Sequence, residues 1–305
     1  MDEISGSDLT GAPGQQVRVC MLDEKPLTTW EDAVVWLRNQ PDQRQLVLDA
    51  FYDDPLIDAA ERYFASAEWQ AVSGFLEHRT GKALDVGAGR GIASYALARS
   101  GFVVTALEPD PSAVVGTAAI RRLAAEARLP IEVVEEFSER LPFTDGTFDV
   151  VFARAVLHHM RDLDGACREM FRVLRPGGML IAAREHVISK ESDLGAFLEQ
   201  HPLHHLYGGE HAYLLDRYVG ALKTAGFAAI EVLAPLRSPI NLFPYTIDTL
   251  RAAIVERLTD KIPVRPIWQA ALASRSVFTS LLSVAEPFDD RPGRLYSFVC
   301  RKAPA

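Results

Sequence analysis

Apolar residues in the middle of the chain fall into two kinds of pattern. Short apolar runs lie near residues 82–86, 102–107, 131–134, 148–153, 179–183, 229–233 and 294–301. Most of the segments between them carry apolar residues at the spacing of an amphipathic helix. Short apolar runs are typical of strands buried on both faces, and their alternation with helices predicts a parallel sheet covered on both sides. We therefore expect an α/β fold with a doubly wound sheet.

The same pattern divides the chain into regions. Residues 1–16 are poor in large apolar side chains and predict a flexible tail, whereas residues 17–80 predict a helical cap. This cap either covers a ligand site, with Tyr63 and Trp69 as candidate wall residues, or simply packs on the sheet edge. Residues 81–234 form the predicted core of alternating strands and helices.

A long segment separates the last two predicted strands. Residues 235–293 contain several prolines and predict helices around Ile247–Leu258 and Ile267–Val284. A segment of this length in a compact domain needs its own structure or function, so we expect a helical insertion that serves as a lid or a dimer surface. Residues 294–305 supply the final strand and a short tail.

Composition narrows the class of protein. The net charge of -9 argues against a nucleic-acid partner, which needs a basic surface. Cys20, Cys167 and Cys300 are scattered, which suits a reducing compartment. No apolar run approaches the roughly 18 residues of a spanning helix, and the N-terminus lacks a basic region followed by an apolar one. We expect a cytoplasmic protein without stable membrane insertion.

A glycine-rich turn follows the first core strand. Gly87, Gly89 and Gly91 precede a helical pattern that begins at Ile92. Glycines allow a tight turn and a close approach of the backbone to a ligand. Their spacing is G-x-G-x-G, which is neither the dinucleotide fingerprint nor the phosphate loop. Asp85 stands two residues before the turn, where a carboxylate suits a cationic ligand group better than a pyrophosphate.

The motif DVGAGRG at residues 85–91 resembles the first motif of class I S-adenosylmethionine (SAM) dependent methyltransferases, particularly the ubiquinone/menaquinone-biosynthesis (type 11) group. FDVVFARAVLHHM and VLRPGGMLI, which begin at Phe148 and Val173, resemble further segments of that family. The resemblance covers about Lys82 to Leu233 and the last strand. It implies a Rossmann-like, seven-stranded sheet with an antiparallel last strand, S-adenosyl-L-methionine as cofactor, and methyl transfer as the activity.

The resemblance also implies a set of cofactor contacts. Asp85 and the glycine turn would hold the amino acid end of SAM, and Glu108, at the end of the second strand, would bind the ribose. Phe137 stands where the family commonly has an acid beside the adenine, so it either packs against the ring or belongs to the core. The expected cofactor residues are Asp85, Gly87, Ala88, Gly89, Gly91, Glu108, Pro109, Phe137, Ser138, Glu139 and Arg154.

Catalytic candidates follow the later strands, because loops at the carboxyl ends of strands line the crevice of a doubly wound sheet. A hydroxyl nucleophile needs a base within hydrogen-bond reach, whereas a neutral amine does not. The candidates for that base are His158, His159, His186 and His211. The candidates for substrate binding are Arg184, Tyr207 and Glu210.

Four of the eight histidines lie between residues 201 and 211. Their spacing matches no H-E-x-x-H site or zinc finger, and no cysteine accompanies them, so we predict no metal site.

These observations favour a methyltransferase that acts on an oxygen or nitrogen atom of a small polar biosynthetic substrate, with a saccharide as one candidate. Two other classes stay open. A SAM-binding partner or regulatory protein would keep the cofactor motifs but have a blocked pocket, and an NAD(P)-dependent oxidoreductase would use a similar sheet. We expect a small-molecule substrate as the partner, and a homodimer is one arrangement that the insertion could support.

Overall fold

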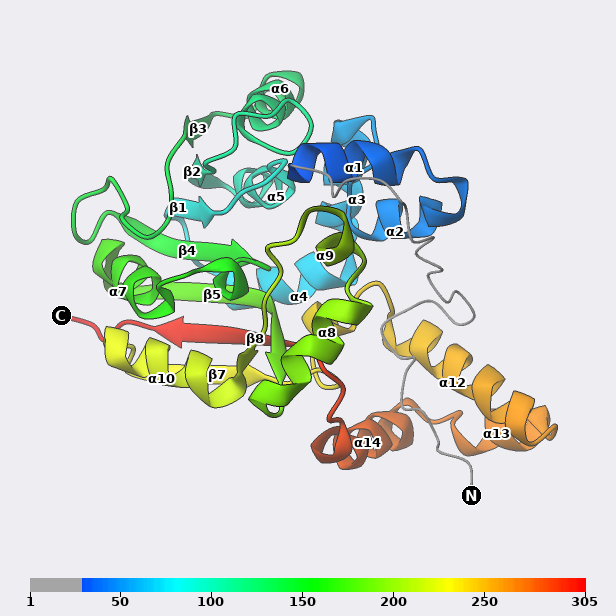
Figure 1. Cartoon of the computed structure of the whole chain (residues 1–305). Coiled ribbons are helices and arrows are strands. Elements are labelled where there is room, and N and C mark those ends of the chain that lie inside the picture. Colours follow the sequence, from blue (N-terminus) through cyan, green and yellow to red (C-terminus); the bar gives the residue numbers. More distant parts are fainter. Residues whose placement is uncertain (1–28) are drawn as a thin grey trace.

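The computed structural model describes residues 29–305 (Figure 1). The predicted tail and the first residues of the predicted cap lie outside the described residues. The strands form one twisted sheet in the order β3-β2-β1-β4-β5-β8-β7, and β6 pairs with the end of β5. The bounds are β1 (Gly81–Val86), β2 (Phe102–Leu107), β3 (Ile131–Val134), β4 (Phe148–Arg154), β5 (Leu174–Ile188), β6 (Tyr213–Leu214), β7 (Ala229–Leu233) and β8 (Arg294–Arg301).

The sheet confirms the predicted architecture. Neighbouring strands from β3 to β5 run parallel, and β8 runs antiparallel to both β5 and β7. The order reverses between β1 and β4, which is the position at which doubly wound sheets open a crevice at the carboxyl ends of their strands. The two-residue β6 is an addition that the sequence pattern did not predict.

Helices cover both faces of the sheet. Alternate strand residues face opposite cores. Leu84 and Val86 share one core cluster with residues of the helices over 163–173 and 215–225, whereas Ala83 shares the other with residues of the helices over 56–65, 67–76 and 92–99. The core helices are α5 (Ile92–Arg99), α6 (Thr117–Ala127), α7 (Leu163–Val173), α8 (Leu194–Gln200), α9 (Pro202–Tyr207) and α10 (Leu215–Ala225).

The N-terminal helices are α1 (Trp30–Arg38), α2 (Arg44–Asp49), α3 (Leu56–Ala65) and α4 (Ala67–Leu76). The helical run breaks between α3 and α4 because Ser66 adopts an extended conformation and caps α4 by accepting a hydrogen bond from the Trp69 backbone N–H. Tyr63 and Trp69 are fully buried in the core, and the ring of Trp69 lies 6.1 Å from that of Phe152.

The first helix of the insertion packs on the core through Ile240, and the later helices form a small apolar cluster of their own beside the sheet (Figure 1). Its helices are α11 (Pro239–Leu242), α12 (Ile247–Lys261), α13 (Arg265–Ala271) and α14 (Arg275–Ala285). The helix predicted over residues 267–284 is therefore two helices, since Ser274 caps a new helix by accepting from the Val277 N–H. Among the described helices, none has the length and apolar character needed to cross a membrane.

Strand β5 is longer than predicted. Its expected end was Ala183, with Arg184 and His186 in a loop beyond it. Instead the strand continues to Ile188 through an irregularity between Ala182 and Glu185, and His186 pairs with Leu295 of β8. The antiparallel partner thus holds His186 on a rigid element at the edge of the crevice.

Candidate active site

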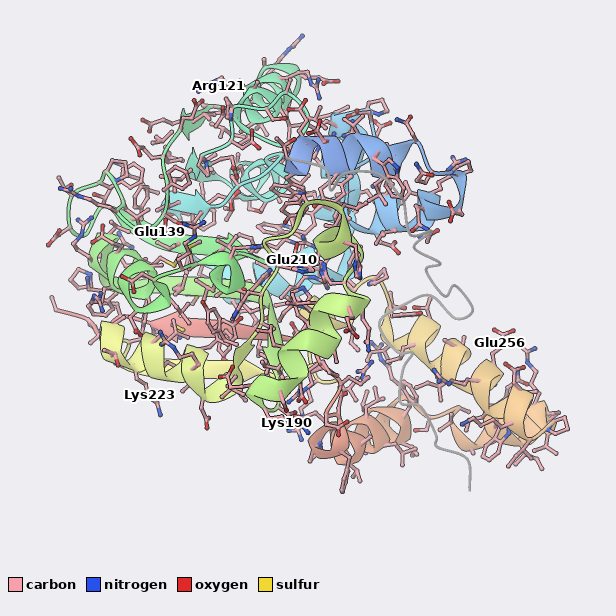
Figure 2. All side chains as sticks on the ribbon, in the orientation of Figure 1. Arg121, Glu139, Lys190, Glu210, Lys223 and Glu256 are labelled. Atoms are coloured by element: carbon pink, nitrogen blue, oxygen red, sulfur yellow. The ribbon has the colours of Figure 1, made fainter. Side chains whose placement is uncertain are left out.

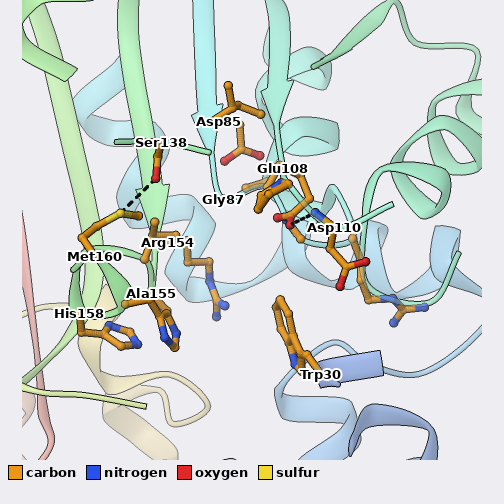
Figure 3. A pocket seen from close by; sticks show the side chains of 18 of the residues that line it. Trp30, Asp85, Gly87, Glu108, Asp110, Ser138, Arg154, Ala155, His158 and Met160 are labelled. Atoms are coloured by element: carbon orange, nitrogen blue, oxygen red, sulfur yellow. Dashed lines mark hydrogen bonds between the residues drawn. The ribbon is translucent and has the colours of Figure 1, made fainter. Parts of the chain in front are cut away.

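A cavity of about 860 Å³ opens at the carboxyl ends of β1, β2, β4 and β5 (Figure 3). Trp30 of α1, Tyr52 after α2 and Tyr207 of α9 complete its wall. The predicted site residues that line it are Asp85, Gly87, Ala88, Gly89, Glu108, Pro109, Phe137, Ser138, Glu139, Arg154, His158, His159, His186, Tyr207 and Glu210. Of the other predictions, Gly91, Arg184 and His211 are not among the described residues that line it.

The glycine turn forms one end of the cavity. Gly87 has a positive φ of 63°, and a Cβ atom added there would lie only 2.7 Å from Cγ2 of Val156. A side chain would therefore strain the backbone and collide with the next loop. Gly91 begins α5 in the left-handed conformation, so it shapes the turn without facing the cavity.

Glu108 joins this turn to the end of β2. One carboxylate oxygen accepts from the Gly89 N–H at 2.8 Å, and the other accepts from the Asp110 N–H at 3.0 Å. Burial raises the pKa of Glu108, and these two hydrogen bonds act in the opposite direction. The carboxylate is thus held in place at the cavity wall, as the predicted ribose contact requires.

Asp85 is 1% exposed and lines the same end of the cavity. Its Oδ2 accepts from the Ser94 hydroxyl at 2.6 Å. Burial raises the pKa of Asp85 to about 7. A carboxyl group that ionises near neutral pH and faces a cavity fits a cationic ligand group, because the cation would replace the solvation that burial removes.

Phe137 lies at the edge of the cavity and is 69% exposed. Core packing, one of the two roles considered for it, is therefore wrong. The neighbouring Ser138 is buried, and its hydroxyl donates to the Met160 sulfur at 3.0 Å. An exposed ring beside a pocket can pack on a flat ligand group. SAM, the cofactor that the sequence implies, fits this end of the cavity. The end combines the buried Asp85, the glycine turn, Glu108 after β2 and the exposed ring of Phe137.

Arg154 stands between the two ends of the cavity (Figure 3). Its guanidinium forms a two-point ion pair with Glu68 of α4, at 2.6 Å from Nε to Oε1 and 3.0 Å from Nη2 to Oε2. Arg184 lies 3.8 Å from the same carboxylate and donates to the carbonyls of Ile240 and Phe243. Arg184 thus ties the insertion to the core, and its guanidinium is engaged away from the cavity.

The opposite end of the cavity is polar. His158 is 2% exposed, and its Nδ1 lies 2.7 Å from Oε2 of Glu185. Glu185 is fully buried and also accepts the backbone N–H groups of Val156, Leu157 and His158 at 3.1 Å each. Burial raises the pKa of Glu185, and the three backbone donors act in the opposite direction. Because the carboxylate already accepts these three N–H groups, we assign Nδ1 of His158 as a fourth donor to it.

His186 is fixed in the same way. Its Nδ1 lies 2.8 Å from the carbonyl oxygen of Gly293, which can only accept, so Nδ1 donates. Burial lowers the pKa of His158 well below its ordinary value and that of His186 to about 3. Both imidazoles are therefore neutral at physiological pH, and the Nε2 atom of each keeps a free lone pair.

Glu210 and two further histidines surround this pair. The hydroxyl of Tyr207 donates to Oε1 of Glu210 at 3.0 Å. Nε2 of His159 lies 3.8 Å from Oε2 of Glu210, and Nδ1 of His201 lies 3.9 Å from Oε1. His211, by contrast, packs on the ring of Tyr213. The structure therefore brings His158, His159 and His186 together and leaves His211 apart.

Sequence reasoning missed the aromatic wall and the support of His158. The ring of Trp30 stacks on that of Tyr207 at 6.5 Å and meets Tyr52 edge-on at 6.1 Å. Tyr63 and Trp69 were considered instead, although their place in an apolar helical stripe is typical of core residues. No local signal identified Glu185, since its role depends on the register of β5 against the loop after β4.

Known proteins agree with this geometry. A family model described as a methyltransferase domain matches residues 84–182. A ubiquinone biosynthesis O-methyltransferase from Methylobacterium nodulans is 29% identical over 52% of this chain, and the match spans 64% of that relative's length. A cycloartenol-C-24-methyltransferase from Arabidopsis thaliana is 29% identical over 72% of this chain and 71% of its own.

Solved structures show the same fold. The phosphoethanolamine N-methyltransferase 2 of Haemonchus contortus, solved with SAM, superposes with a TM-score of 0.51 at 19% identity. The superposition covers 86% of this chain and 60% of that one. The matched domain and these relatives identify residues 84–182 as a methyltransferase domain similar to those of the SAM-dependent type 11 group, and the solved structure shares its fold.

Proposed function

We propose that this protein transfers the methyl group of SAM to an oxygen or nitrogen atom of a small polar acceptor. The observation that carries the proposal is a single cavity that joins the cofactor residues at one end to neutral histidines at the other. SAM supplies an electrophilic methyl group on a sulfonium with a good leaving group. An acceptor bound at the histidine end would face that methyl group.

The residues of this chain align the cofactor with the acceptor, keep water out of the cavity and remove the proton of the acceptor. Asp85 and Glu108 hold two ends of the cofactor, and the ring pair of Trp30 and Tyr207 covers the cavity and restricts water. Alignment of two reactants can supply roughly 7–11 kcal/mol of the barrier. His158 suits the role of general base, because Glu185 fixes its tautomer and leaves Nε2 free to accept a proton.

The acceptor is best described as small and rich in hydroxyl groups, and a saccharide is our candidate. The histidine end offers lone pairs on imidazole nitrogens and carboxylate oxygens, which accept hydrogen bonds from hydroxyls. Arg154 and Arg90, two of the cations that line the cavity, are already paired with Glu68 and Asp54. This pairing favours a neutral polar acceptor over an anionic one.

The two other classes considered fit less well. A SAM-binding partner protein without transfer activity would need a blocked pocket, whereas the cavity runs from Asp85 to His186. An NAD(P)-dependent oxidoreductase does not agree with the matched methyltransferase domain. Assembly and location stay predictions. A homodimer, the arrangement considered for the insertion, would use exposed apolar side chains such as Ile267, Val284 and Phe288, and sedimentation analysis would test it.

The first experiment is calorimetry of SAM and S-adenosylhomocysteine, with NAD in parallel. We expect micromolar binding of the SAM pair, weakened in Asp85→Asn and Glu108→Gln and unchanged in the exposed control Glu126→Gln. Transfer from labelled SAM to a panel of saccharides, other polyols and amines then identifies the acceptor. Binding of NAD instead of the SAM pair would refute the proposal, and SAM binding without transfer to any acceptor would favour the partner protein.

A further inference from the structure

Three side chains from separate elements meet at the histidine end of the cavity. His158 follows β4, His186 lies on β5, and Glu210 belongs to the loop after α9, near the centre of the molecule (Figure 2). One ligand atom from each lies within 4.8 Å of the other two. His158 and Glu210 are buried, and His186 is partly buried.

In each of these three residues, a second polar atom of the side chain already forms a hydrogen bond. Nδ1 of His158 donates to Glu185, Nδ1 of His186 donates to the Gly293 carbonyl, and Oε1 of Glu210 accepts from Tyr207. Histidines that bind metals characteristically donate their other ring N–H to a carboxylate or a carbonyl. Here that arrangement leaves Nε2 of each histidine and Oε2 of Glu210 as the remaining ligand atoms, and Nε2 of His158 lies 3.8 Å from that oxygen.

We propose that His158, His186 and Glu210 bind a divalent first-row transition metal ion. Two imidazoles and one carboxylate are the ligand set of catalytic zinc sites and of non-haem iron sites, both of which keep positions open for a substrate. The hydrogen bonds at Nδ1 of both imidazoles support this geometry, because they leave Nε2 of each ring unprotonated, and only an unprotonated nitrogen can bind a metal.

Charge supports the same assignment. Glu210 is 7% exposed, and within residues 29–305 it has one hydrogen bond and no lysine or arginine partner. Its Oε2 lies 3.8 Å from Nε2 of His158, which is too far for a hydrogen bond. A buried carboxylate needs a compensating charge. A divalent ion would balance the charges of Glu210 and Glu185 together.

The catalytic use of this ion rests on the proposed function. An acceptor hydroxyl placed at the open positions would lose its proton more readily, and a second adjacent oxygen would chelate, which favours acceptors with vicinal hydroxyls. Because His158 would then be a ligand, the proton would pass to His159 or His201, the remaining imidazoles near Glu210. A bond then forms between the acceptor oxygen and the methyl carbon as the methyl–sulfur bond breaks.

The test is metal binding by the full chain after removal of bound metal with a chelator. Calorimetry with Zn²⁺ and visible absorption with Co²⁺ would be measured on wild type, His186→Gln, Glu210→Gln and His205→Gln. His205 is the matched control, since it is exposed and bonds to the Glu199 carbonyl. We expect one Zn²⁺ per chain, bound at least tenfold more weakly by the first two variants and equally by His205→Gln.

Absence of Zn²⁺ binding by folded wild type would overturn the metal site, and so would equal binding by wild type, His186→Gln and Glu210→Gln. Thermal melting confirms that each variant is folded. S-adenosylhomocysteine binding in the same samples separates the two proposals. If the protein binds S-adenosylhomocysteine but no metal, only the metal site is refuted. If it binds metal but not S-adenosylhomocysteine, only the proposed function is refuted.

Discussion

The two ends of the cavity are built in different ways. At the cofactor end, Asp85, Gly87 and Gly89 follow one another within a single strand and turn, and Glu108 lies on the neighbouring strand. At the histidine end, His158, His186 and Glu210 come from three elements spread over more than fifty residues. A local motif therefore defines the first end, whereas only the folded sheet defines the second. The residues proposed for the cofactor therefore lie close together in the sequence, whereas those proposed for the acceptor are brought together by folding.

The largest expected effect concerns the ion pair between the two ends. Glu68→Gln leaves Arg154 and Arg184 without their shared carboxylate in a buried site. Loss of one partner of a buried pair costs about 3–5 kcal/mol of the free energy of unfolding. Chemical denaturation would measure this loss, with the exposed Glu61→Gln on α3 as the matched control. A loss no greater than that of the control would mean that the pair does not hold the two ends together.

The second prediction compares ligand affinity at the cofactor end of the cavity with ligand affinity at the histidine end. Asp85→Asn removes the carboxylate that faces the cationic end of the cofactor, and a hydrogen bond to a charged group is worth about 1.5–3 kcal/mol. We expect S-adenosylhomocysteine binding to weaken by roughly 10- to 100-fold, because 1.4 kcal/mol is a factor of ten. Zn²⁺ binding at the histidine end should not change. Equal weakening of both ligands would show that the ends are coupled.

The same substitution should stabilise the ligand-free protein at pH 8. The folded-state pKa of Asp85 is about 7 and its ordinary value is 3.8, so the folded state holds the proton more tightly than the unfolded state. Stability is therefore lost as pH rises between these values, and the loss is complete above pH 7. The side chain introduced by Asp85→Asn cannot ionise, so the variant does not lose this stability at pH 8. A melting temperature at pH 8 below that of wild type would contradict this.

A third effect is the pH dependence of cofactor binding. The ionised form of Asp85 attracts the cationic group, so affinity should fall as pH drops through 7. Between pH 8 and pH 6 the ionised fraction falls about tenfold for a group with this pKa, and calorimetry should show a similar loss for S-adenosylhomocysteine. Asp85→Asn supplies the control, because its weaker binding should be flat over this range. If the affinity of wild type for S-adenosylhomocysteine did not change between pH 8 and pH 6, ionisation of Asp85 would not control binding.

The sequence predicted most of the sheet and the cofactor end for a physical reason. Short runs rich in apolar residues mark sheet strands, so β2, β3, β7 and β8 could be located to the residue. The glycine turn also needs only local geometry. Histidine spacing, by contrast, compares neighbours along the chain, so it could not show that folding brings His158, His186 and Glu210 together. The extension of β5 past Ala183 was missed because its pairing with β8 spans more than one hundred residues.

The smallest expected effect tests whether the aromatic wall belongs to one end or to both. Trp30 stacks on Tyr207, whose hydroxyl holds Glu210, so Trp30→Leu should disturb the histidine end. An aromatic pair contributes about 0.5–1.5 kcal/mol, which predicts a change of roughly two- to tenfold in the acceptor KM. Because Asp85 and Glu108 are held by their own hydrogen bonds, the dissociation constant of S-adenosylhomocysteine should stay within a factor of two. Trp36→Leu on the same helix is the matched control, since Trp36 is not among the described residues that line the cavity. An effect on the cofactor as large as that on the acceptor would mean that the wall closes over both ends as a single cap.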